Sequence, residues 1–203
     1  MTRTKKYSFV LLAIGCWLLA VGCLSCSSDK PVEGTEEEQA YDVMQRKGQW
    51  DKIVKRSQEE SVQSVACQKV VRLAQYRLGL ITPFALRDCL TDSHDVLTNP
   101  LAALMMSDVY MQLGMVNMAQ RAAFEAMVKM GQQADNSRAL RRLTETAIIT
   151  KQYDLALKYI TLLEENSAHR EWARSMRQVI AHPTPEYEKL QKSYEETEDQ
   201  FFL

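Results

Sequence analysis

The sequence predicts an all-α fold in which antiparallel pairs of helices stack on one another. Beyond residue 35, apolar residues recur at the three- and four-residue spacing of helices, and no segment alternates as a strand does. The 203 residues include only seven glycines and five prolines, so residues that break helices are few. Similar short segments also recur at intervals that fit one helix pair each.

Capping residues indicate where several helices begin. Thr35 is followed three residues later by Glu38, which is the pattern of a capping box. Thr82, Asn99 and Thr184 each precede a proline, and a proline at the first helical position loses no hydrogen bond. We therefore expect a helix to begin directly after each of these capping residues.

Apolar stripes run through the helices that these caps predict. Residues 116–130, 140–147 and 153–163 each place apolar or small side chains on one helical face, which is expected to be buried. Seven of the ten methionines lie between residues 105 and 130. Their spacing favours core packing, and a methionine-rich binding groove is the alternative.

Three short segments, 48–53, 114–119 and 151–156, repeat one pattern. Each begins with a turn, continues with a large side chain (Trp50, Val116 or Tyr153) and places a small or apolar residue three positions later. Gly79 supplies a further turn between the first two segments, so the spacing is about 33 to 37 residues.

This pattern resembles the tetratricopeptide repeat. In that family a small residue and an aromatic one lie on the first helix, as Ser107 and Tyr110 do here, and a glycine such as Gly114 forms the turn. Alanines such as Ala119 and Ala126 let the second helix approach closely. The resemblance covers about residues 38–181 and implies a short solenoid of stacked antiparallel pairs. The closing proline is missing after residue 130, and an irregular helical bundle is the alternative.

A second resemblance covers residues 110–172. The segments 110–127, 138–145 and 170–173 are similar to the C-terminal region of an uncharacterised bacterial family of multi-span membrane proteins. That family has no known activity, so the resemblance implies a fold and a membrane location only. This chain lacks the many membrane spans, and a shared transport-like role does not follow.

The N-terminal residues have the pattern of a bacterial lipoprotein export signal. Arg3 and two lysines precede a run without charge from residue 7 to residue 24, and residues 20–23 fit a lipobox that ends in Cys23. We expect Cys23 to carry the acyl chains, palmitate among them, with Cys26 as the alternative site. An uncleaved signal anchor is the competing interpretation. Two or three acyl chains attach a protein to a membrane far more firmly than one.

These patterns predict four parts of the chain. Residues 1–22 form the signal peptide, 23–37 a lipid-anchored flexible linker, 38–183 the helical repeat domain and 184–203 an acidic C-terminal capping helix or tail. The expected location is the bacterial cell envelope, at the periplasmic side of a membrane or exposed at the surface. Cys67 and Cys89 are expected to remain free thiols, because their positions along neighbouring helices do not match.

Composition narrows the function. Lys plus Arg is 25 and Asp plus Glu is 26, a balance that argues against nucleic-acid binding. We find no catalytic motif, no histidine–cysteine cluster for a metal, and no sign of a cofactor or small-molecule substrate. The preferred hypothesis is a non-enzymatic scaffold that binds another envelope protein. The alternatives are a structural subunit of a membrane complex and an enzyme of unknown class.

Stacked repeats of this kind would present their first helices on a concave face. Eight side chains are then expected to bind the partner protein there: Lys69, Tyr76, Arg77, Asp108, Gln112, Arg138, Arg141 and Glu145.

Overall fold

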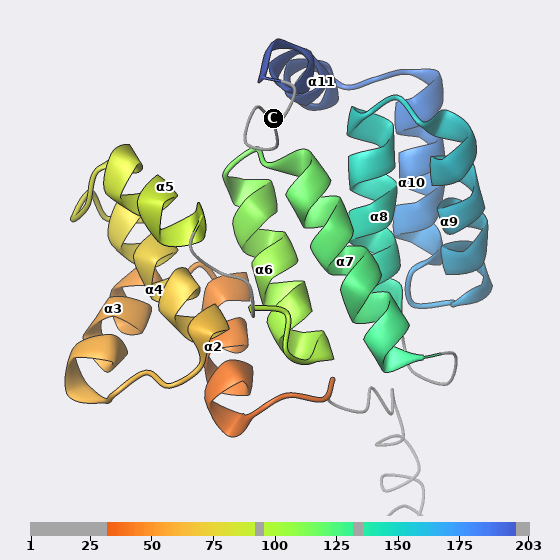
Figure 1. Ribbon diagram of the computed structural model, residues 1–203. Coiled ribbons are helices and arrows are strands. Elements are labelled where there is room, and N and C mark those ends of the chain that lie inside the picture. Colours follow the sequence, from red (N-terminus) through yellow and green to blue (C-terminus); the bar gives the residue numbers. More distant parts are fainter. Residues whose placement is uncertain (1–31, 92–95, 132–135, 198–203) are drawn as a thin grey trace, which may run out of the picture. The chain divides into compact units, whose positions relative to one another are not determined.

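The computed structural model describes residues 32–91, 96–131 and 136–197, and every regular element within them is an α-helix (Figure 1). The predicted all-α class is therefore confirmed. No helix in these ranges is both long enough and apolar enough to span a bilayer. The helices are, in chain order, α2 (Glu36–Arg46), α3 (Trp50–Glu59), α4 (Val65–Arg77), α5 (Pro83–Thr91), α6 (Pro100–Gln112), α7 (Val116–Met130), α8 (Ser137–Ile149), α9 (Tyr153–Glu165), α10 (Arg170–Ala181) and α11 (Pro185–Thr197).

The predicted helix starts are confirmed. In the capping box of α2, the N–H of Glu38 donates to Thr35 Oγ1 at 3.1 Å and the N–H of Thr35 donates to Glu38 Oε2 at 2.9 Å. Asn99 caps α6 by accepting a hydrogen bond from the N–H of Ala102 at 2.9 Å. Helices α5 and α11 begin at the two expected prolines. Both predicted anchor cysteines, Cys23 and Cys26, lie outside the described residues.

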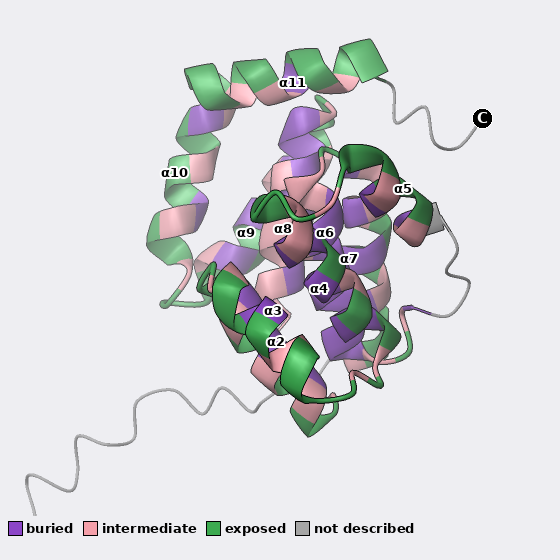
Figure 2. Ribbon diagram, turned by 90° about the vertical axis from the view of Figure 1, so that its left-hand side faces the viewer, coloured by how far each residue is buried: buried purple, intermediate pink, exposed green. Residues whose placement is uncertain are grey.

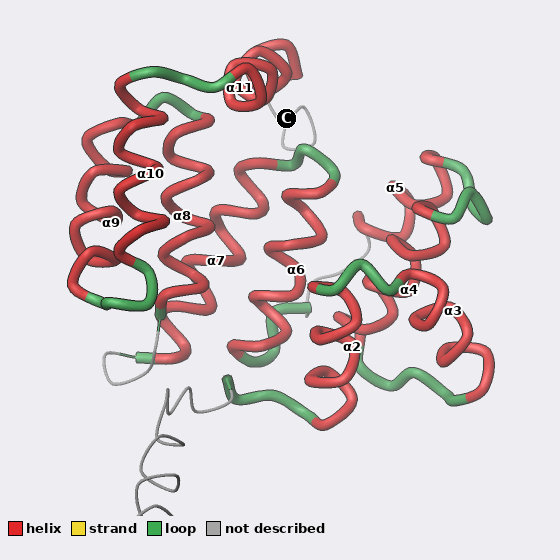
Figure 3. The backbone as a smooth tube through the Cα atoms, turned by 180° about the vertical axis from the view of Figure 1, so that it is seen from behind, coloured by secondary structure: helices red, strands yellow, loops and turns green. Residues whose placement is uncertain are grey.

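Four turns of the fold share one hydrogen-bond pattern. Gly48, Gly79, Gly114 and Lys151 have φ values between 58° and 76° and follow α2, α4, α6 and α8. In each turn this residue donates to the carbonyl three positions earlier, and the next residue donates to the carbonyl five positions before itself. These bonds form the Schellman motif, which satisfies the last carbonyls of a helix. Figure 3 shows these turns as short loops between helices.

Contacts between helices follow chain order. Consecutive helices pack against each other from α2 through α5, and again from α6 through α10. The first helices of the pairs, α2, α4, α6 and α8, also contact one another in sequence. These contacts fit stacked helix pairs, and a tetratricopeptide-like solenoid stays a prediction.

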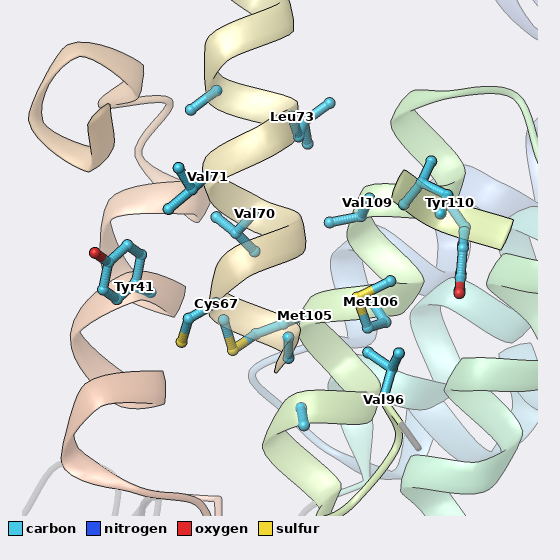
Figure 4. Close-up of a cluster of buried hydrophobic side chains, with 14 of the residues drawn as sticks. Tyr41, Cys67, Val70, Val71, Leu73, Val96, Met105, Met106, Val109 and Tyr110 are labelled. Atoms are coloured by element: carbon cyan, nitrogen blue, oxygen red, sulfur yellow. The ribbon is translucent and has the colours of Figure 1, made fainter. Parts of the chain in front are cut away.

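The largest apolar cluster joins α2, α4 and α6 (Figure 4). Tyr41, Val70, Leu73 and Met105 are almost completely buried in it. Met106 is buried there as well, and the other methionines of residues 105–130 pack partly buried against this cluster or the next one. Core packing is thus confirmed for this methionine-rich stretch. Figure 2 shows the buried positions on the inward faces of the helices.

Helix α11 departs from the pairwise order. It contacts α8, which lies three helices earlier in the chain, and crosses the end where α8 turns into α9 (Figure 1). Gln191 Nε2 donates to the carbonyl of Ile148 at 2.9 Å, and Lys151 forms an ion pair with Glu195 at 2.5 Å. The helix therefore covers the last Schellman turn.

Candidate functional site

The eight side chains predicted to bind a partner lie on α4, α6 and α8, the first helices of three pairs. The structure brings some of them together and separates others. Asp108, Arg138 and Glu145 belong to one charged cluster, whereas Arg77 and Gln112 form a hydrogen bond of 3.1 Å elsewhere.

The charged cluster is an internal network of ion pairs. Arg138 contacts Asp42 at 2.7 Å and Asp108 at 2.6 Å, which links α8 to both α2 and α6. Arg142 extends the network to Asp108 at 2.7 Å and to Glu145 at 2.6 Å. Charge-assisted hydrogen bonds of this kind are shorter and stronger than those between neutral groups. The cluster therefore holds three first helices together, and its charges are matched inside the chain.

Electrostatics agree with this structural role. Burial alone would raise the pKa of Asp108, but Arg138 and Arg142 outweigh burial and hold that pKa below its ordinary value. Burial raises the pKa of Glu145 above its ordinary value, against the opposing attraction of Arg142. Asp108 is thus held ionised between two arginines, which is a stable arrangement rather than one prepared for proton transfer.

Two other predicted partner residues are also engaged within the chain. The guanidinium of Arg141 lies 4.5 Å from the ring centroid of Trp172, in cation–π geometry. Lys69 donates to the backbone carbonyl of Cys89, which ties α4 to α5.

The remaining predicted residues mark a different surface, at the turn between α4 and α5. Leu78 is 44% exposed, Leu80 is 61% exposed and Phe84 is 71% exposed. Arg77 lies directly before them, and its hydrogen bond to Gln112 shows that the end of α6 adjoins this turn. We define the turn surface as Arg77, Leu78, Leu80, Phe84 and Gln112. Predicted Tyr76 packs partly buried against the core beneath it.

The local sequence explains why these apolar side chains are exposed. Gly79, with φ of 71°, reverses the chain in a Schellman turn and has open space where a Cβ would lie. Leu80 follows at the outer side of the turn, and Phe84 comes one residue after the proline that starts α5. Exposed apolar side chains gathered at one place indicate an interaction site more strongly than scattered ones do.

A cleft of about 840 Å³ lies at the opposite end of α2, α4 and α6, where these helices begin. Two of its carboxylates already bind residues that precede helices: Glu37 accepts from the N–H groups of Gln63 and Ser64 at 2.9 and 2.8 Å. Glu38 accepts from the hydroxyl of Ser64 and the amide of Asn99, both at 2.8 Å. The polar groups of the cleft therefore organise helix starts.

Side chains that could hold a metal ion do not gather in the described ranges. No cluster of three or more histidine, cysteine, aspartate or glutamate side chains there could hold a metal ion. Cys67 and Cys89 are free thiols, as expected, with Cys67 buried and Cys89 half-buried. Burial raises the pKa of the Cys67 thiol to about 12, so the nucleophilic thiolate is rare at neutral pH.

Two groups of residues were not predicted from the sequence: Asp42 and Arg142 of the charged network, and Leu78, Leu80 and Phe84 at the centre of the turn surface. A usable signal existed for the turn surface only. Residues 78–84 contain four large apolar residues around a glycine turn and a helix-starting proline, a pattern that predicts apolar side chains that short elements bury poorly.

Comparison with known proteins gives a family without an assigned activity. No curated protein and no solved structure matches the chain. The family described as a family of unknown function (DUF6057) matches residues 2–203. The match covers nearly the whole sequence, so the chain belongs to the DUF6057 family.

Proposed function

We propose that the protein is a lipid-anchored, non-enzymatic scaffold of a bacterial cell envelope, and that it binds another envelope protein through the turn surface. The single observation that supports this binding site is the exposure of Leu78, Leu80 and Phe84 beside Arg77. The other predicted partner residues, Asp108 and Arg138 among them, are held by internal ion pairs.

The chemistry of the turn surface defines the partner segment. Leu80 and Phe84 offer apolar area that a leucine, phenylalanine or similar side chain would remove from water. Arg77 donates to Gln112 but has no ion-pair partner within the described residues, so it favours a carboxylate. We therefore propose an apolar partner segment that carries at least one acidic residue.

The anchor is the second part of the proposal. The charge pattern of residues 1–24 and the lipobox before Cys23 support export and acylation. Acyl chains would then hold the protein at a membrane, and none of the helices described in the structure could span that membrane. A tethered binding module works at high effective concentration towards partners in the same membrane.

Co-isolation from the native envelope tests the binding site. The full chain is compared with a variant carrying Leu80→Ser and Phe84→Ser, and with the control Phe124→Ser on α7, a side chain that is 51% exposed. Loss of these two apolar side chains should lower partner recovery by at least about tenfold, because each would contribute roughly 1.5–3 kcal/mol when the partner buries it fully. Phe124→Ser should leave recovery unchanged. Equal recovery with all three proteins would contradict the proposal.

A structural subunit of a membrane complex is the second candidate, and the exposed residues Phe124 and Val128 on α7 and Leu162 on α9 favour it. A subunit without a free existence would bury these helices too. If Phe124→Ser abolishes recovery while the variant at residues 80 and 84 does not, the subunit interpretation replaces the scaffold.

A further inference from the structure

The path of α11 carries the chain towards the turn surface. Near its start, the Tyr187 hydroxyl contacts Met176 of α10 at 3.3 Å. Further along, Gln191 bonds to the end of α8. In its last turn, the Tyr194 hydroxyl donates to Asn117 Oδ1, at the beginning of α7, at 3.3 Å. The helix thus runs from the α10 side to the turn between α6 and α7.

That turn adjoins the turn surface directly. Gln112, the last residue of α6, bonds to Arg77, the last residue of α4, at 3.1 Å. Helices packed in contact have axes about 8–10 Å apart. Six residues of extended chain reach about 20 Å. Because Tyr194 contacts the beginning of α7 and Gln112 bonds to Arg77, an extended segment of this length spans the distance from the end of α11 to the end of α4, where the turn surface begins.

The sequence that follows α11 is chemically complementary to the turn surface. It reads Glu198-Asp199-Gln200-Phe201-Phe202-Leu203, two carboxylates followed by an amide and three large apolar residues. The order matches the surface as well. A chain coming from α11 meets Arg77, which suits its carboxylates, before the more exposed Leu80 and Phe84, which suit its phenylalanines.

We propose that this segment, residues 198–203, docks on the turn surface of its own molecule and thereby competes with the partner protein. The competition with a partner protein rests on the proposed function. The docking of the segment on the turn surface does not depend on the presence of a partner.

Photocrosslinking of the purified full chain tests the docking. A benzoylphenylalanine in place of Phe202 should crosslink to residues 77–87 of the same molecule, identified by mass spectrometry of the monomer. The same group in place of Phe124 is the matched control and should not reach these residues. Leu80→Ser with Phe84→Ser should lower the crosslink about tenfold, because the buried apolar area is lost.

A charge variant guards against a folding artefact. Arg77→Glu leaves the apolar residues in place and should also lower the crosslink severalfold, by repelling Glu198 and Asp199. Crosslinks from position 202 to another part of the chain, or only between two copies, would overturn the docking. Because no partner is present in this experiment, its outcome is independent of the co-isolation experiment, which tests only the partner site.

Co-isolation also tests the competition. If the segment docks, Phe201→Ser with Phe202→Ser should raise partner recovery severalfold, and unchanged recovery would refute the competition.

Discussion

Glu38 of α2 shows how one carboxylate joins distant parts of this fold. It is 2% exposed and accepts hydrogen bonds from Thr35, Ser64 and Asn99, the residues that precede α2, α4 and α6. The sequence predicted its local bond to Thr35, because a capping box lies within four residues. It could not predict the other two, since those partners are 26 and 61 positions away and only the packing brings them near.

Protonation of Glu38 should weaken the fold. Burial opposes ionisation, but the hydrogen bonds from Thr35, Ser64 and Asn99 outweigh it, so the pKa lies below its ordinary value. An acid of this kind stabilises the fold above its unfolded pKa, and the contribution is lost as pH falls through the lower folded pKa. The free energy of unfolding should therefore decrease as the pH drops below about 4.5, the ordinary pKa of this carboxyl group.

Urea unfolding at several pH values measures this effect. Glu38→Gln should cost about 1–3 kcal/mol at neutral pH, because buried donors lose a charged acceptor, and it should flatten the acid dependence. The exposed Glu36→Gln, in the same first turn, is the control and should keep the wild-type dependence. A Glu38→Gln variant with an unchanged pH profile would disprove the role assigned to Glu38.

At the scale of elements, the sequence predicted the helices whose signals are local. The capping residues before α2, α5, α6 and α11 were identified because caps and prolines act within one turn. The glycine turns after α2, α4 and α6 were identified for the same reason. The crossing of α11 over α8 was not predicted, since an amphipathic pattern shows that one face is buried and not which helix buries it.

Close packing of α7 against α6 gives a prediction at this scale. Ala119 is completely buried, and its carbonyl accepts a hydrogen bond of 2.8 Å from Ser107 of α6. Ala119→Leu adds three heavy atoms to this contact, and overpacking of this kind typically costs about 1–3 kcal/mol. Gln120→Leu, at a half-buried position, should change stability by about 0.5 kcal/mol or less. Chemical denaturation of both variants compares them, and the opposite ranking would mean that α7 is rotated.

The whole molecule combines a local pattern with long-range charge pairing. The Asp42–Arg138 and Asp108–Arg138 pairs join residues 96 and 30 positions apart. The sequence predicted Arg138 and Asp108 to be exposed partner-binding residues, and this was wrong, because both form ion pairs within the chain. The sequence pattern of a helix does not show whether a charged side chain faces solvent or another helix. The turn surface was predicted only in part, through Arg77 and Gln112, for the same physical reason.

Anchoring is also a property of the whole molecule. If Cys23 carries the acyl chains, mass spectrometry of the mature protein should find a diacylglyceryl group on an N-terminal Cys23. Cys23→Ser should leave an unprocessed form without lipid, because the thiol accepts the diacylglyceryl group before cleavage. A lipid on Cys26 would move the site, and an intact Met1 without lipid would exclude the anchor.

The most direct test of the scaffold is photocrosslinking inside the native envelope, with the reactive group placed at one residue at a time. Positions 80 and 84 of the turn surface should both crosslink to the same envelope protein, and exposed position 124 on α7 should not. If positions 80 and 84 capture no protein while position 124 does, the turn surface is not the binding site and the proposed function is wrong.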